Sequence, residues 1–331
     1  GIHLSKNECV EILENNEYVF VLSEGLYATR ACAFTNQYFS IKPTKREVSQ
    51  DIFIPGHRCM PFVDPDVLSF AFTFVYKGRK LNTKVVEFDS TTAQEFYSLY
   101  GYEYAPQYIA QDVANKNKEI FGSDYALVPK VELTAVDLLP LKNDGFTNGD
   151  RLICCVKDWD KCIIEISFKH REESVFQVTY DDIERENWYR LLEKFLLESF
   201  ETAGPKSSIE EQLALIFANH RNQLCTKYCG SIEELFDRSN KVGFELFGVE
   251  TRIWKKGEEI PAVGKWNSIE IPDLQDEEEF RDFTQAIYEE MPTYVLDAFL
   301  NDQIYNDIFD PDAILTRLYP DFYKINSAQR K

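Results

Sequence analysis

The sequence predicts an α+β protein with a β-rich N-terminal half, built from antiparallel hairpins and a few helices, and a mainly helical, acidic C-terminal half. Before residue 180, apolar residues alternate with a period of two in several stretches, which is typical of half-buried strands. After residue 180 they recur with helical spacing. The 331 residues are 44% hydrophobic and 14% aromatic, enough for a large core. We therefore expect two domains, a mixed α+β domain with an antiparallel sheet over residues 1–180 and a mainly α-helical acidic domain over residues 181–331.

The N-terminal half begins with a short helix over residues 5–13, where Ser5 and Glu8 form a capping-box pattern. Alternating residues separated by short turns then predict two strand pairs, residues 17–23 with 26–34 and residues 67–76 with 79–88. The second pair turns at Lys77-Gly78, a two-residue hairpin connection. Helical spacing follows over residues 90–100 and 105–121, and a strand is expected over residues 131–139.

The stretch CVKDWDKC, residues 155–162, predicts another hairpin with its turn at Trp159-Asp160. This register pairs Cys155 with Ile164. Because neighbouring strand residues point to opposite faces, Cys154 and Cys155 cannot both aim at one ion without a β-bulge. A thiol among isoleucines behaves as a small hydrophobic group, so we interpret these cysteines as core residues. Trp159, at the turn, is expected to be exposed and to serve as a contact point.

The C-terminal half begins with a strongly amphipathic helix over residues 181–200, capped by Asp181 or Asp182 and ended by Gly204-Pro205. Further helices are expected over residues 207–228 and 231–240, and a strand pair over residues 242–254 and 267–272. Acidic helices are predicted over residues 277–290, 293–308 and 312–318.

The charge of the chain is strongly negative, −20 in total. Residues 270–312 hold 14 acidic residues and one basic residue, a net charge of −13. This sign repels nucleic-acid backbones and anionic lipid, so we expect no nucleic-acid partner and no membrane contact. It favours a basic protein partner. We expect the contact surface to include Glu277, Glu278, Asp282 and Glu289.

The compartment is predicted from the cysteines and from the missing targeting signals. No stretch has the roughly 18–20 apolar residues of a membrane helix, and the N-terminus shows no signal-peptide pattern. Eight cysteines in a long chain without that pattern favour free thiols and a cytoplasmic location. Whether a leader preceded Gly1, and which oligomeric state the protein adopts, both stay open.

Two further stretches contain residues that carry chemistry elsewhere. In IPGHRCMPFVDPD, residues 54–66, His57 lies near Asp64 and Asp66 in a proline-rich loop, a combination that suits acid–base or metal chemistry. The prolines equally fit a loop that orders the following strand. The run FYSLYGYEYAPQY, residues 96–108, either lines a pocket for a planar ligand or builds core.

Three hypotheses follow, and whether the protein is an enzyme stays open. The chain has no GxGxxG, GxSxG, HExxH or kinase motif, and we expect no cofactor and no metal site. The leading hypothesis is therefore a binding protein that uses its acidic C-terminal surface. The first alternative is a hydrolase-like or metal-dependent enzyme with a site around His57, Asp64 and Asp66. The second is an acidic protein that mimics the charge of a nucleic acid.

Overall fold

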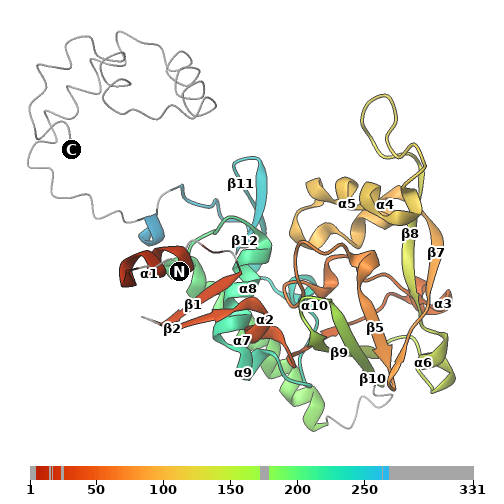
Figure 1. Cartoon of the computed structure of the whole chain (residues 1–331), viewed down its shortest axis with the longest axis horizontal. Coiled ribbons are helices and arrows are strands. Elements are labelled where there is room, and N and C mark those ends of the chain that lie inside the picture. Colours follow the sequence, from red (N-terminus) through yellow and green to blue (C-terminus); the bar gives the residue numbers. More distant parts are fainter. Residues whose placement is uncertain are drawn as a thin grey trace, which may run out of the picture. The chain divides into compact units, whose positions relative to one another are not determined.

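The computed structural model of the chain describes residues 5–14, 16, 18–23, 26–171, 179–262 and 264–267. Figure 1 shows an α+β arrangement in which several antiparallel sheets lie beside helices, and the N-terminal half is rich in strands. The predicted fold class is therefore confirmed.

The largest sheet has five strands in the order β3-β9-β10-β5-β6. Its central strands β9 and β10 form an antiparallel hairpin, and β5 pairs with β10 in parallel. The strands are β3 (Tyr38–Ile41), β5 (Thr73–Tyr76), β6 (Arg79–Lys80), β9 (Arg151–Asp158) and β10 (Ile163–Lys169).

A three-stranded antiparallel sheet has the order β4-β8-β7. Its strands are β4 (Ile52–Phe53), β7 (Thr83–Asp89) and β8 (Lys130–Asp137). Helices α4 (Ser90–Glu95) and α5 (Ala105–Gln111) lie beside it, and together they enclose the smaller of two hydrophobic cores. Phe88, Phe96 and Ile109 are buried there.

Two isolated hairpins complete the strands. They are β1 (Val19–Ser23) with β2 (Leu26–Thr29) and β11 (Val242–Phe247) with β12 (Glu250–Lys255). The second strand of the pair expected from residues 242–254 and 267–272 lies outside the described residues from residue 268 onward, so this pairing stays a prediction. Residues 242–255 form a hairpin by themselves, because the chain turns at Gly248, whose φ is +65°.

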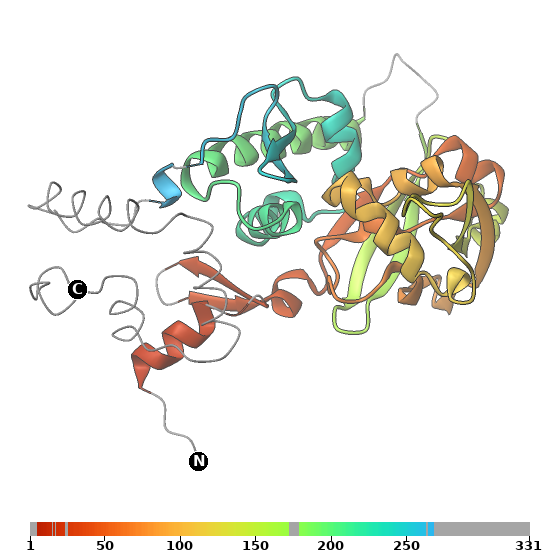
Figure 2. The ribbon, with the colours of Figure 1, turned by 90° about the horizontal axis from the view of Figure 1, so that it is seen from above.

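The remaining helices are mostly short, except for the 23-residue α7. The α-helices not yet named are α1 (Lys6–Glu14), α2 (Arg30–Phe34), α3 (Lys45–Ser49), α6 (Leu139–Asn143), α7 (Tyr180–Thr202), α8 (Ile209–Asn219), α9 (Arg221–Leu224) and α10 (Ile232–Arg238). The 3-10 helices are η1 (Gly56–Cys59), η2 (Ser69–Ala71), η3 (Ser98–Tyr100), η4 (Tyr102–Tyr104), η5 (Val113–Asn115) and η6 (Lys265–Asn267). In Figure 2 the green and cyan helices α7 to α10 lie in one group beside the sheets.

The N-terminus of α7 shows how the sequence sets a helix boundary. The predicted caps Asp181 and Asp182 are wrong, because Thr179 is the N-cap. Its hydroxyl accepts from the backbone of Asp182, whose carboxylate accepts from the backbone of Thr179 in return, so the two form a capping box.

The hairpin of β9 and β10 forms where the sequence predicts it, but in a different register. A β-bulge at Ile163/Ile164 leaves Lys157 without a cross-strand partner and shifts the pairing by one residue. Cys155 therefore pairs with Glu165, and Cys154 pairs with Ile166. The side chain fully enclosed in the larger core is that of Cys154, because a one-residue shift exchanges the two faces of a strand.

The hairpin predicted from residues 67–76 and 79–88 is shorter than expected. Residues 69–71 form η2, and the paired strand starts only at Thr73. The turn is correctly predicted, since Lys77 and Gly78 both have positive φ, as a type I′ turn requires. After two residues in β6 the chain leaves this sheet and enters the other as β7.

The larger core extends across residue 180. The ring of Phe62 contacts Phe217 of α8 at 4.7 Å between centroids, and Phe217 contacts Trp188 of α7 at 6.3 Å. The division into residues 1–180 and 181–331 stays a prediction. None of the described helices is both long enough and apolar enough for a membrane crossing.

Candidate functional site

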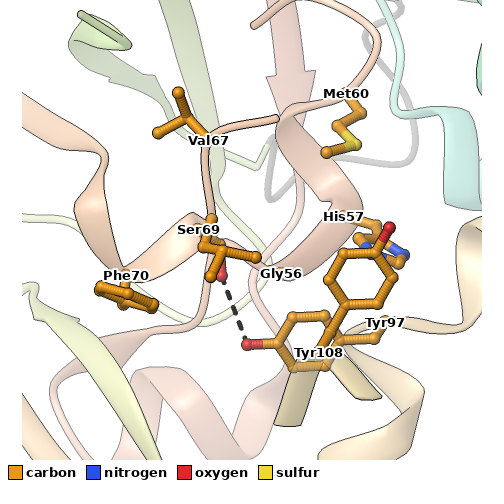
Figure 3. A pocket seen from close by; sticks show the side chains of 9 residues that line it. Gly56, His57, Met60, Val67, Ser69, Phe70, Tyr97 and Tyr108 are labelled. Carbon is orange, nitrogen blue, oxygen red and sulfur yellow. Dashed lines mark hydrogen bonds between the residues drawn. The ribbon is translucent and has the colours of Figure 1, made fainter. Parts of the chain in front are cut away.

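His57 lies in η1 and is surrounded by tyrosine rings. Tyr108 stands perpendicular to it with the ring centroids 4.2 Å apart, Tyr97 is perpendicular at 5.3 Å, and Tyr100 is tilted at 5.0 Å. The backbone N–H of His57 donates to the carbonyl of Phe96 at 3.0 Å, which fixes η1 against the segment that carries the tyrosines. Figure 3 shows the rings of His57, Tyr97 and Tyr108 grouped together.

A small cavity, which we call the His57 cavity, adjoins these rings. It has a volume of about 10 Å³, close to the size of one water molecule. The hydroxyls of Ser69 and Tyr97 are 3.3 Å apart at its edge (Figure 3). The cavity is lined by Gly56, His57, Met60, Val67, Leu68, Ser69, Phe70, Tyr97 and Tyr108.

His57 is buried without a hydrogen bond to either ring nitrogen among the described residues. Only 1% of the residue is exposed, and neither Nδ1 nor Nε2 has a partner. Burial lowers the pKa of His57 to about 3, and the Tyr97 backbone opposes this shift only in part. The ring is therefore neutral at physiological pH, and one of its nitrogens is an acceptor.

Asp64 and Asp66 do not join His57. Neither carboxylate lines the His57 cavity, and neither contributes to the lowered pKa of His57. Asp64 accepts a hydrogen bond from the backbone N–H of Asp66 at 3.0 Å, a local turn, and Asp66 accepts one from the hydroxyl of Tyr18. The acid–base or metal set predicted from this loop is thus divided between two places.

Asp66 instead lines a much larger cavity, which we call the cleft. Its volume is about 970 Å³, the size of sites that take drug-sized ligands or peptide segments. Met60 and Tyr108 line both the cleft and the His57 cavity, so the two share a wall. Among the described residues, the cleft is lined by Glu14, Asn16, Tyr18, Val19, Phe20, Val21, Arg30, Met60, Pro65, Asp66, Tyr100, Tyr104, Tyr108, Thr202, Ala203, Lys206, Ser207, Ser208, Ile209, Glu210, Glu211, Leu215, Asn219, Glu250 and Arg252.

The cleft carries a negative charge. Five of its lining residues are carboxylates and three are cations, a difference of −2. Two of the cations are held by carboxylates of the same cleft, Arg30 by Glu210 at 2.5 Å and Arg252 by Glu250 at 2.5 Å. Arg252 also donates to the backbone carbonyls of Lys206, Thr251 and Ser207. Its guanidinium therefore stabilises the packing of these segments.

The remaining carboxylates of the cleft accept hydrogen bonds from neutral donors. Glu14 accepts from the hydroxyl of Tyr27 at 3.2 Å, and Glu211 accepts from the backbone N–H of Ser207 at 3.0 Å. Asp66 accepts from Tyr18, as described above. Because these donors are uncharged, the three carboxylates keep an excess of negative charge in the cleft.

Burial and the negative charge of the cleft raise the pKa of two of its tyrosines. Burial raises the pKa of Tyr108, and Glu210 and Asp66 raise it further. Burial also raises the pKa of Tyr100 well above its usual value, with Glu210 adding to the shift. The Tyr100 hydroxyl is buried without a partner among the described residues. These phenols are neutral at physiological pH, and the face of a tyrosine ring attracts a cation.

Two other predicted features have different environments. Trp159 is 4% exposed and contacts Tyr18 edge-to-face at 6.1 Å, so the prediction of an exposed contact residue is wrong. The physical reason is that the Trp159 ring belongs to the larger hydrophobic core and packs against Tyr18, the residue before β1. The cysteines at 9, 32, 59, 154, 155, 162, 225 and 229 are all free. Burial raises the pKa of Cys162 to about 11 and that of Cys229 to about 12, which disfavours the reactive thiolates.

Glu277, Glu278, Asp282 and Glu289 lie outside the described residues, as does the whole acidic stretch 270–312. In the described part of the chain, no three His, Cys, Asp or Glu side chains gather in positions that would hold a metal ion. Comparison with protein-family models, with curated proteins and with solved structures finds no match.

The sequence pointed to part of this site and missed the rest. The run at residues 96–108 supplies both core, through Phe96 and Tyr97, and cleft wall, through Tyr100, Tyr104 and Tyr108. Arg30 and Glu210 were missed because the two partners are 180 positions apart. Nothing near either residue in the sequence indicates the other.

Proposed function

We propose that the protein is a binding protein that takes a cationic ligand, such as a basic segment of a partner protein, in the cleft. The observation that carries this proposal is the combination of a cavity of about 970 Å³ with five carboxylates and four tyrosines in its wall. Carboxylates and tyrosine faces are the groups that recognise cations. The net charge of −20 favours the approach of such a partner.

The lining favours binding over catalysis. Among the described residues of the cleft there is neither a histidine nor a cysteine. Its serines, Ser207 and Ser208, bond to Glu211, and Ser208 caps helix α8. Covalent catalysis by a serine usually needs a base that a third group orients, whereas the Ser207 hydroxyl donates directly to the Glu211 carboxylate with no histidine of the described lining between them. The enzyme hypothesis built on His57, Asp64 and Asp66 gains no support from their positions.

The acidic stretch 270–312 remains a second proposed contact surface for the same basic partner, in a protein that we place in the cytoplasm. Free cysteines throughout the chain support this placement. Truncation after residue 270 tests the stretch, since unchanged affinity for a basic peptide would remove it from the proposal.

The cleft is tested in the full chain by calorimetric titration with capped tetralysine and, as the oppositely charged probe, capped tetraglutamate. We expect tetralysine to bind and tetraglutamate not to bind. The double variant Glu14→Gln, Asp66→Asn removes two exposed cleft charges and should weaken tetralysine binding about tenfold.

The matched control is the double variant Glu87→Gln, Asp160→Asn, which removes two exposed charges outside the cleft. Both variants change the net charge equally, so a purely general attraction predicts equal losses. Equal losses, or no binding of tetralysine, would contradict the proposed site.

A further inference from the structure

We infer that the His57 cavity is the specificity subsite of the cleft and receives the terminal ammonium group of an alkylamine, such as a lysine side chain. This inference rests on the proposed function and adds the chemical class of the ligand. Its basis is the position of the cavity, its size and the unpaired polar atoms in its wall.

The His57 cavity lies directly beside the cleft. Tyr108 and Met60 separate the His57 cavity from the cleft and line both. Tyr108 is only partly buried, and no hydrogen bond of its hydroxyl is present among the described residues. Rotation of this one side chain joins the two cavities. A ligand that lies in the cleft then reaches His57 with a group that extends past Tyr108.

The wall of the His57 cavity contains buried polar atoms without partners among the described residues. An unpaired polar group inside a protein is costly, and a ligand that pairs with it recovers that cost. Both ring nitrogens of His57 lack a partner, and the ring is neutral because its pKa is lowered. Its acceptor nitrogen suits an N–H donor. The backbone of Tyr97 lies close enough to the ring to oppose part of the shift in its pKa, so it faces the N–H of the ring.

The size of the His57 cavity and the charges near it favour an ammonium group as the N–H donor of the ligand. A cavity of about 10 Å³ accommodates a group as small as water, and a terminal ammonium group meets that limit. The tyrosine faces beside His57 attract its charge, and Asp66 and Glu210 lie near enough to Tyr108 to raise the pKa of its phenol. A planar guanidinium or a trimethylated ammonium group is too large and lacks the compact N–H donors.

The test compares three capped tetrapeptides of equal charge in calorimetric titrations of the full chain: tetralysine, tetra-arginine and tetra(trimethyl-lysine). We expect tetralysine to bind at least about tenfold tighter than the other two. A preference for lysine is informative because arginine is usually the better partner for carboxylates and aromatic faces. Equal affinities, or a preference for arginine, would overturn the inference.

Two variants test whether the preference for tetralysine arises in the His57 cavity. His57→Leu should reduce the preference for tetralysine to about onefold, while the affinity for tetra-arginine stays unchanged and shows that the variant is folded. Tyr108→Ala also removes a ring from the cleft wall, so it should weaken the binding of both peptides and reduce the preference as well. A variant that keeps the full preference would remove its residue from the subsite. If none of the three peptides binds, the proposed function fails; if all bind equally, only this inference fails.

Discussion

His57 and Arg58 are neighbours in η1, and both are buried, yet their polar atoms are paired to different extents. The two terminal nitrogens of Arg58 donate to Glu47 at 2.5 Å and 3.2 Å, whereas its Nε has no hydrogen-bond partner among the described residues and lies 4.0 Å from Glu233. The two ring nitrogens of His57 have no partner among the described residues. The paired nitrogens of Arg58 connect η1 to Glu47 and so stabilise the fold. The ring nitrogens of His57 stabilise no such contact and can hydrogen-bond to a ligand.

The Arg58–Glu47 pair connects three neighbouring segments of the chain. Glu47 is fully buried, forms the capping box of α3 with Thr44, and accepts from the backbone N–H of Ile54 at 2.7 Å. One carboxylate thus connects α3, the segment after β4 and η1. Such a pair is destabilising to break, because removal of one partner leaves the other as an unpaired charge in a buried site.

The largest expected effect is the loss of this pair. Glu47→Gln keeps the shape of the side chain but leaves the Arg58 charge without its partner, so we expect the free energy of unfolding to fall by about 3–5 kcal/mol. Urea denaturation followed by circular dichroism measures it. The control Glu87→Gln breaks an exposed pair with Lys130 and should cost less than about 1 kcal/mol. Equal losses would mean that the buried pair adds nothing.

The second effect is a loss of stability in acid that His57 causes. Its pKa is about 3 in the folded chain and about 6.5 in the unfolded chain, so the unfolded chain binds a proton first as the pH falls. Between pH 7 and pH 4 this lowers the free energy of unfolding by about 3 kcal/mol. Denaturation of the wild type and of His57→Leu at both pH values isolates the contribution, which the variant should lack.

Two other groups serve as references for that measurement. Burial raises the pKa of Glu233 to about 7, so its contribution has the opposite sign, is present at low pH, and is lost as the pH rises through 7. The contribution of Glu233 is the same in the wild type and in His57→Leu, so it cancels when the two pH dependences are subtracted. His220, stacked on Phe195 at 3.6 Å, is less buried, and His220→Leu should change the pH dependence less. An equal or larger change in this variant would contradict the role given to His57.

The smallest effect concerns the glycine that starts η1. Gly56 has φ +51°, and a Cβ there would lie 2.0 Å from the carbonyl oxygen of Phe96, the acceptor of the His57 backbone N–H. Gly78 has φ +74° with nothing within 4 Å. Gly78→Ala should cost about 1 kcal/mol for backbone strain alone, and Gly56→Ala about 1–2 kcal/mol more. Thermal unfolding compares them, and equal costs would mean that η1 and the tyrosine segment are not tightly fixed.

The hairpin of β9 and β10 shows which features of the fold can be predicted from the sequence. Period-two alternation was enough to locate the hairpin of β9 and β10, because alternation follows directly from strand geometry. The bulge at Ile163/Ile164 was not predictable, since no residue type demands it, and it reversed the positions of Cys154 and Cys155. Local patterns therefore gave the elements but not the register.

The site was harder to predict for a related reason. His57 was grouped with Asp64 and Asp66 because they are close in the sequence, whereas its actual neighbours come from a segment about 40 residues later. Those tyrosines were recognised as pocket-forming or core-forming, but their meeting with His57 depends on tertiary packing. Contacts between distant segments carry no local signal in a single sequence.

The most direct measurement is the ¹⁵N NMR spectrum of the His57 ring in the full chain, assigned with His57→Leu and titrated with capped tetralysine. We predict that the resonance of the acceptor nitrogen moves as the ammonium group donates to it, and that tetra(trimethyl-lysine) leaves it in place. An unchanged His57 resonance at saturating tetralysine would contradict the assignment of this cavity to a cationic ligand.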